Sequence, residues 1–266
     1  VATLAASVAD LGAAFTYTDS SAVAVGSITT NGALANANLG TVTGITTNGG
    51  AVSVSAGGAL AVNEAILSTP TTGTTAGTKV GGAVLLTTST GGVSSGASGT
   101  ITTTGQVSTV TGIDTAGAGG EVLVRAQAGN VSLGAAITAS GGASVETADT
   151  SGAGGVVTVR ADSGNITLNN IVTSGGAITG GSTGAAGGLV QLKTGTATST
   201  IGQGTSTIVA AGTGAAADGA LKVQATGAVT LDQANNVATL AASVADLGAA
   251  FTYNDRSAVA VGSINT

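Results

Sequence analysis

Apolar and polar residues alternate along this chain in short runs separated by glycine. The clearest runs lie in residues 119–142 (GGEVLVRAQAGNVSLGAAITASGG) and 154–176 (GGVVTVRADSGNITLNNIVTSGG). Each contains three segments with an apolar residue at every second position, which is typical of strands with one buried face. Gly-Asn, Gly-Gly and Ser-Gly between the segments favour the tight bends that join strands. Three strands and three bends predict one turn of a parallel coil.

This coil recurs along the whole chain. Pairs of apolar residues separated by one position return at intervals of 29 to 38 residues: Val23/Val25, Val52/Val54, Val84/Leu86, Val122/Val124, Val157/Val159, Val190/Leu192, Leu221/Val223 and Val259/Val261. We expect Gly/Thr/Ser/Ala-rich segments such as residues 177–187 to leave the coil as loops at one corner, which explains the variable interval. The pattern predicts an all-β solenoid with three short strands per coil.

The chain also carries a long repeat. Residues 237–266 copy residues 1–30, and the copies differ only at Thr18/Asn254, Ser20/Arg256 and Thr29/Asn265. We interpret residues 1–236 as one complete solenoid unit and residues 237–266 as the start of the next tandem unit, in a single continuous solenoid. The intervals between the apolar pairs divide one unit into about seven coils, so we expect the second unit to continue the first without a seam.

A helix is the competing prediction for the start of the unit. Val1, Leu4, Val8, Leu11 and Phe15 lie at spacings of three and four, and alanine favours helix. However, residues 14–18 alternate as a strand does, and a helix would leave the neighbouring strand edges unpaired. We therefore expect strands here.

Composition argues against an enzyme. Charged residues make up 7% of the chain and aromatic residues 2%, and there is no His, Cys or Met. Zinc and copper therefore lack their usual nitrogen and sulfur ligands. The carboxylates are scattered, and the nearest approach to a lyase-like cluster is Asp149, Arg160 and Asp162, which we attribute to chance surface charge. We predict no catalytic, cofactor-binding or metal-binding residues, and no cofactor.

Charge and hydropathy also limit the partners. The net charge of −6 comes from few groups, without the basic stripe that a nucleic-acid partner requires. No run of 18 apolar residues occurs, so we expect no transmembrane segment.

Two rows of polar residues stand out. Arg125, Arg160 and Lys193 each follow the second apolar residue of successive coils, so they are expected to stack about 4.8 Å apart. We favour a solvated outward row partly neutralised by Asp162, and the alternative is a cationic ladder for an anionic glycan or a neighbouring filament. Asn130 and Asn165 are expected to form a similar ladder at a turn.

Aromatic and threonine residues allow two further hypotheses. Phe15 and Tyr17, with their copies Phe251 and Tyr253, are the only aromatic residues, and each pair falls on one face of a strand. We expect a stacked core pair in preference to a sugar-binding platform. Threonine-rich segments such as residues 101–104 suggest the hypothesis of an ice-binding face. However, their threonines do not stay in register from one coil to the next.

The motif GGxVxVxA..GN(V/I)xL...IxTxGG and its Gly/Thr-rich corners resemble large bacterial exoproteins of the filamentous haemagglutinin type. The resemblance implies a right-handed parallel β-helix, secretion through a partner transporter, and a role in adhesion, aggregation or matrix building. We therefore predict a non-enzymatic fibrous protein of the bacterial cell surface. Its expected partner is itself, by covalent tandem repeats, end-to-end stacking or lateral bundling, with surface glycans or neighbouring cells as further candidates. The alternatives are a glycan-binding or glycan-cleaving β-helix protein and, lower in rank, an ice-binding solenoid.

Overall fold

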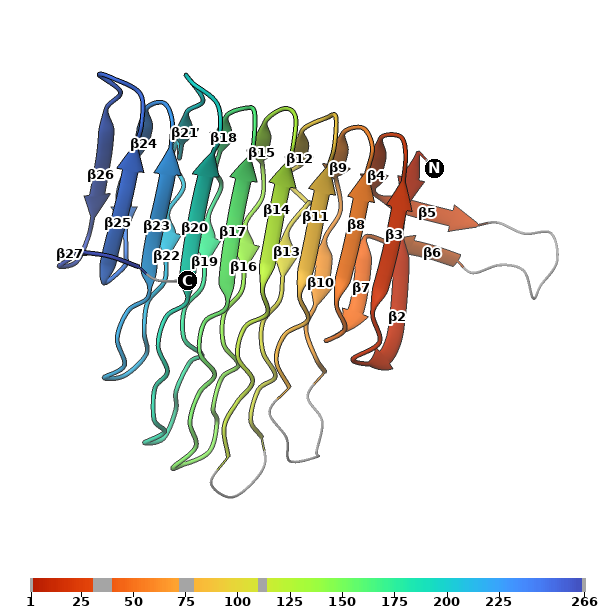
Figure 1. The fold of residues 1–266 in the computed structure, drawn as a ribbon. Coiled ribbons are helices and arrows are strands. Elements are labelled where there is room, and N and C mark those ends of the chain that lie inside the picture. Colours follow the sequence, from red (N-terminus) through yellow and green to blue (C-terminus); the bar gives the residue numbers. More distant parts are fainter. Residues whose placement is uncertain (1, 31–39, 72–78, 110–113, 265–266) are drawn as a thin grey trace.

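The chain winds into a right-handed parallel β-helix with three sheets, seen in a computed structural model that describes residues 2–30, 40–71, 79–109 and 114–264 (Figure 1). Each typical coil supplies one strand to sheet C, the next to sheet A and the third to sheet B. Seven strands of sheet C fall within residues 1–236, which confirms the predicted coil number. The described residues contain no helix, and so none that is able to cross a membrane.

Three sheets and one hairpin account for all described strands. Sheet A contains β1 (Thr3–Leu4), β4 (Val23–Val25), β9 (Leu60–Val62), β12 (Val93–Ser95), β15 (Val131–Leu133), β18 (Ile166–Thr167), β21 (Ile201–Gly202), β24 (Val229–Asn235) and β26 (Phe251–Asp255). Sheet B contains β2 (Ala6–Leu11), β7 (Ile45–Asn48), β10 (Ile66–Ser68), β13 (Ile101–Thr102), β16 (Ile137–Thr138), β19 (Ile171–Val172) and β22 (Ile208–Val209). Sheet C contains β3 (Phe15–Asp19), β8 (Val52–Ala56), β11 (Val84–Thr88), β14 (Val122–Ala126), β17 (Val156–Ala161), β20 (Leu189–Thr194), β23 (Ala220–Ala225), β25 (Thr239–Val244) and β27 (Ala260–Val261).

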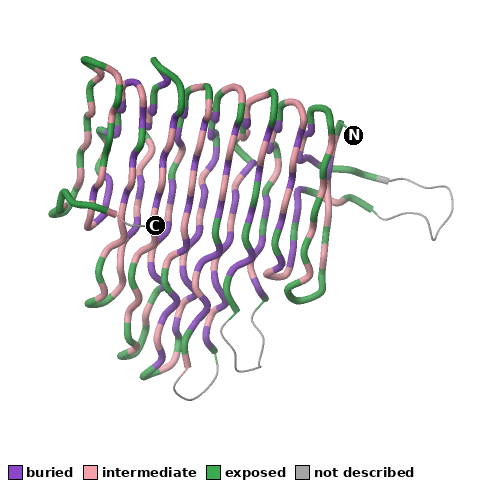
Figure 2. Tube along the Cα trace, viewed as in Figure 1, coloured by how far each residue is buried: buried purple, intermediate pink, exposed green. Residues whose placement is uncertain are grey.

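Columns of aliphatic side chains fill the centre of the coil. Figure 2 shows buried residues recurring along the successive coils. In sheet B a single column consists of isoleucine at six successive levels, each directly paired with the next and at most 2% exposed: Ile45, Ile66, Ile101, Ile137, Ile171 and Ile208. Valine and leucine from sheets A and C complete the core. Burying one such side chain contributes about 1.5–3 kcal/mol, so each coil adds a similar increment of stability.

An antiparallel hairpin leaves the coil between sheets A and B. It consists of β5 (Ser27–Thr30) and β6 (Gly40–Thr43), and it projects from the N-terminal part of the helix (Figure 1). This hairpin was not predicted from the sequence, although the alternating Ser-Ile-Thr-Thr and Gly-Thr-Val-Thr segments are typical of strands.

The Gly/Thr-rich segments leave the coil at one corner, as predicted, and this corner lies between sheets B and C. The sequence predicts these segments as loops, but backbone hydrogen bonds hold them together. In three successive coils an outgoing limb (residues 103–108, 139–144 and 173–178) packs against a returning limb (residues 115–120, 150–155 and 183–188). We call these six limbs the glycine flange; it forms the lower extension of the ribbon in Figure 1.

Backbone hydrogen bonds connect the limbs to one another. Gly142 N–H donates to Gly117 O at 2.7 Å, and Gly142 O in turn accepts from Gly152 N–H at 2.9 Å. Along the returning limbs the more exposed side chains recur at every third residue, as at Thr183 and Ala186. A repeat of three with bonds to neighbouring segments is typical of polyproline II-like packing. Alternation at period two therefore predicts the strands but not the flange.

The duplicated segments occupy different sheets. Phe15–Asp19 forms β3 in sheet C, whereas its copy Phe251–Asp255 forms β26 in sheet A. The prediction that Val23/Val25 begins the series of sheet C strands is wrong, because β4 pairs with β9 in sheet A. The spacing of apolar residues predicts these segments as strands, but it does not predict which sheet each strand joins.

Candidate binding surface on sheet C

Four of the six cationic residues of the chain lie on the outer face of sheet C, on four successive strands. Arg125 on β14 pairs with Arg160 on β17, which pairs with Lys193 on β20. The predicted ladder is therefore confirmed. Lys222 on β23 pairs with Gln191 on β20, two residues before Lys193. Lys222 therefore lies next to the ladder without being in line with it. We call Arg125, Arg160, Lys193 and Lys222 the cationic face.

Local alternation places these side chains outward. In β14, β17 and β20 the buried residues alternate with half-exposed ones, and the cations fall on the half-exposed positions. Valine and leucine occupy the inward positions, so apolar burial fixes the register that brings the cations together.

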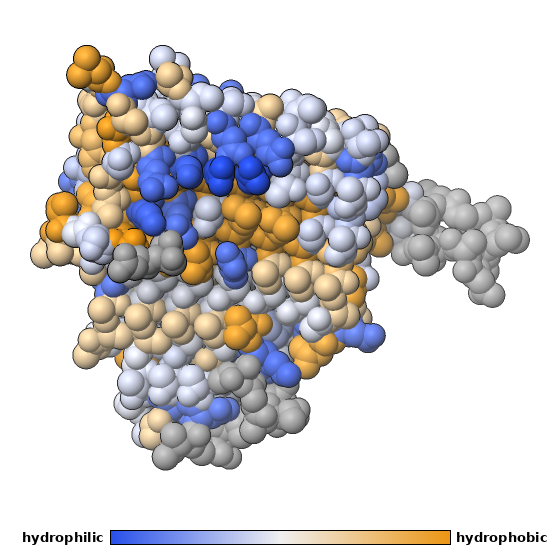
Figure 3. Space-filling model, viewed as in Figure 1, coloured by the Kyte–Doolittle hydropathy of each residue, from blue (hydrophilic) through white to orange (hydrophobic). Residues whose placement is uncertain are grey.

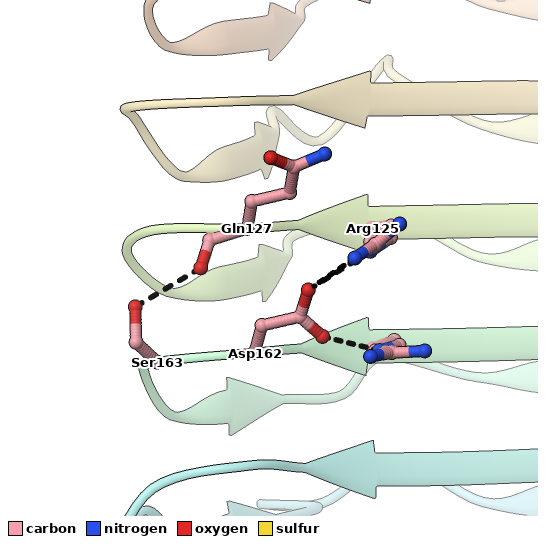
Figure 4. Close-up of polar contacts among 5 residues, drawn as sticks. Arg125, Gln127, Asp162 and Ser163 are labelled. Carbon is pink, nitrogen blue, oxygen red and sulfur yellow. Dashed lines mark hydrogen bonds and ion pairs between the residues drawn. The ribbon is translucent and has the colours of Figure 1, made fainter.

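Asp162 joins the two arginines across the coils (Figure 4). Its Oδ2 accepts from Nε and Nη2 of Arg125, at 3.0 and 2.6 Å, and its Oδ1 accepts from Nε of Arg160. Partial burial raises the pKa of Asp162, but the hydrogen bonds and charges of both arginines outweigh this effect, so its pKa lies below the ordinary value. The carboxylate holds two like charges on adjacent strands, where they would otherwise repel.

Lys193 and Lys222 extend the positive charge beyond the ion pairs that Asp162 forms with Arg125 and Arg160. Together with Arg160, Gln191 and Gln224 they line a shallow hollow of about 240 Å³. Lys193 forms no ion pair with any residue in the described ranges. Figure 3 shows hydrophilic side chains gathered over the middle strands of this face, with apolar side chains directly below them.

The apolar neighbours come from the outward positions at the start of the same strands. Leu123, Val156 and Leu189 are half-exposed there, and Leu85 on β11 is 37% exposed. The same face thus combines fixed cations, amide side chains that can donate and accept hydrogen bonds, and an apolar strip. This combination suits a ligand that is both anionic and partly apolar.

The asparagine ladder is also confirmed, and it is structural. Asn130 Oδ1 accepts from the backbone N–H of Asn165 at 2.9 Å, and Asn165 Oδ1 accepts from the backbone N–H of Thr200 at 2.8 Å. Each side chain therefore satisfies a backbone donor in the next coil at the bend between sheets C and A.

The aromatic pairs pack against the core. Phe251 and Tyr253 are stacked with ring centroids 6.4 Å apart, and both lie against the buried cluster, as do Phe15 and Tyr17. Tyr253 Oη donates to Asp255, and burial together with this carboxylate raises the pKa of the phenol. The contact between Phe251 and Tyr253 matches the expected stacked core pair.

The remaining candidate residues do not assemble into a reactive cluster. Asp149, which directly precedes the returning limb 150–155, is fully buried, so its interpretation as surface charge is wrong. Ser108 Oγ donates to it at 2.8 Å, whereas Asp162 pairs with Arg125 and Arg160. Among the described residues no group of three acidic side chains could hold a metal ion. The threonine row in sheet B ends after two levels, since Thr102 pairs with Thr138 and Thr138 with Val172.

A scan of protein-family models and searches of curated proteins and solved structures find no match to this chain.

Proposed function

We propose that this chain is part of a non-enzymatic fibrous protein that forms an extracellular or cell-surface filament for adhesion, aggregation or matrix building. The observation that carries this proposal is the unbroken isoleucine column of sheet B, from Ile45 to Ile208. A column of this kind lets each added coil bury the same apolar surface against its neighbour. Length then follows from the number of coils, as in other solenoid proteins.

The sequence motif supports the same role. The parallel β-helix agrees with the resemblance to filamentous haemagglutinin-type exoproteins, which implies secretion through a partner transporter and a place at the bacterial surface. The duplicated segment supports growth by tandem repetition within one polypeptide, and end-to-end stacking of subunits is the alternative. The copies occupy different sheets, so the segment takes up different strand positions at the two ends of the described coil.

A second candidate function is glycan binding by the same shaft, and the cationic face favours it. The hollow between Arg160, Lys193 and Lys222 offers positive charge and amide hydrogen-bond donors on a rigid sheet. This function is compatible with the filament role, since a shaft can carry binding sites along its length.

The filament role is tested on the native protein in the cells that produce it. An antibody raised against residues 84–264 is used for immunogold electron microscopy of intact cells and for a blot of denatured extract. We expect gold along fibres outside the cell and a band far above the 24.3 kDa of this chain. Label confined to the cell interior, or a band at that mass, would contradict the filament proposal.

A further inference from the structure

Positive charge is concentrated on one part of a molecule whose other charged residues are mostly acidic. The chain has six cationic residues and a net charge of −6, yet four cations share the outer face of sheet C over four levels. Asp162 pairs with the two arginines of the cationic face, and Lys193 forms no ion pair with any residue that the structure describes. Adjacent like charges on a sheet are unfavourable unless an anion compensates them.

We propose that the cationic face binds a linear acidic polysaccharide that lies along the axis of the β-helix, across strands β14 to β23. Levels about 4.8 Å apart give such a chain a row of regularly spaced cations. Arg125 and Arg160 are held in place by Asp162, so they lose little conformational freedom on binding. Lys193 and Lys222 supply the positive charges beyond these two arginines.

The neighbouring side chains favour a sugar over other polyanions. Gln191 and Gln224 line the hollow and can hydrogen-bond to hydroxyl groups, while Leu123 and Leu189 offer an apolar strip to the C–H faces of sugar rings. The cationic face holds no aromatic residue on which a nucleic-acid base could stack, and a DNA duplex presents phosphates without the free ring hydroxyl groups that Gln191 and Gln224 would bind. Double-stranded DNA is therefore a discriminating probe.

The test uses the complete 266-residue chain and a variant of the cationic face. Affinities are measured by isothermal titration at several salt concentrations for heparin, alginate, neutral dextran and a DNA duplex. We expect the natural chain to bind heparin or alginate and not to bind dextran. Its affinity for DNA should be at least tenfold lower than its affinity for the acidic polysaccharide. Lys193→Gln with Lys222→Gln should weaken polysaccharide binding roughly tenfold and flatten its salt dependence. Preference for heparin or for alginate identifies sulfate or carboxylate as the recognised group.

A matched control removes the same charge elsewhere. Lys79→Gln with Arg256→Gln changes the net charge by the same amount at positions outside the cationic face, and it should leave affinity unchanged. Equal loss in both double variants, absence of polysaccharide binding, or DNA binding as tight as heparin binding would overturn the proposal. The inference extends the proposed filament role by naming a partner. Binding is measured on the isolated chain, so either proposal can fail while the other stands.

Discussion

The glycine flange should be intolerant of a single added methyl group. A Cβ built on Gly142 would lie 1.9 Å from the carbonyl oxygen of Gln106, and ordinary contact begins at 3.4 Å. The two limbs would have to separate by about 1.5 Å, which is the difference between these distances. Gln106 O accepts from Gly117 N–H, and Gly117 O accepts from Gly142 N–H, so the same movement disrupts two backbone hydrogen bonds.

The cost of Gly142→Ala follows from these contacts. Overpacking costs about 1–3 kcal/mol, and each backbone bond contributes about 0.5–1.5 kcal/mol, so we expect a loss of roughly 2–6 kcal/mol. Gly202→Ala is the matched control, because its Cβ would meet nothing within 4 Å. There the substitution should leave stability unchanged or raise it by up to about 1 kcal/mol, since alanine has less conformational entropy to lose.

Hydrogen exchange measured by mass spectrometry resolves the effect locally, which suits a solenoid whose coils can open separately. Peptides covering residues 139–155 should exchange faster in Gly142→Ala, and guanidinium unfolding should begin at a lower concentration than in Gly202→Ala. If the two variants exchange and unfold alike, the flange is not closely packed and the argument from limb contact fails.

Three further predictions concern the coil itself. Ile137→Ala should destabilise the protein by about 2–5 kcal/mol in denaturant titration, since it leaves a cavity in the isoleucine column, whereas half-exposed Thr138→Ala should change stability by less than about 0.5 kcal/mol. Asp162 has a folded pKa below its ordinary value of 3.8, so its ionised form stabilises the fold above that pH and this contribution is lost as pH falls through the lowered pKa. The stability difference between the natural chain and Asp162→Asn should therefore be constant near neutral pH and vanish in acid, and a pH-independent difference would disprove the linkage. Asn165→Ala should cost about 1 kcal/mol because the Thr200 N–H loses its acceptor, while Asn165→Asp keeps an acceptor and should cost less.

The sequence by itself determined the strands, the coil and the outward rows. Alternation at period two places one face of each short strand in the core whatever its neighbours are, so the parallel coil and the stacking of Arg125, Arg160 and Lys193 follow from local pattern. The bends could be found for the same reason, because Gly-Asn pairs such as those preceding β15 and β18 favour turns in any context.

Only the tertiary structure decided which sheet each strand joins and how the corners pack. Two thirty-residue copies that differ at only three positions lie in sheets A, B and C at one place and in sheets C and A at the other, because register depends on the coil already formed beside them. The flange was hidden from an analysis of hydrophobic alternation, since its limbs are held by backbone hydrogen bonds and close glycine contacts between segments about 35 residues apart. Lys222 joined the cationic face for the same reason: pairing between coils, and not spacing along the chain, brought it beside Lys193.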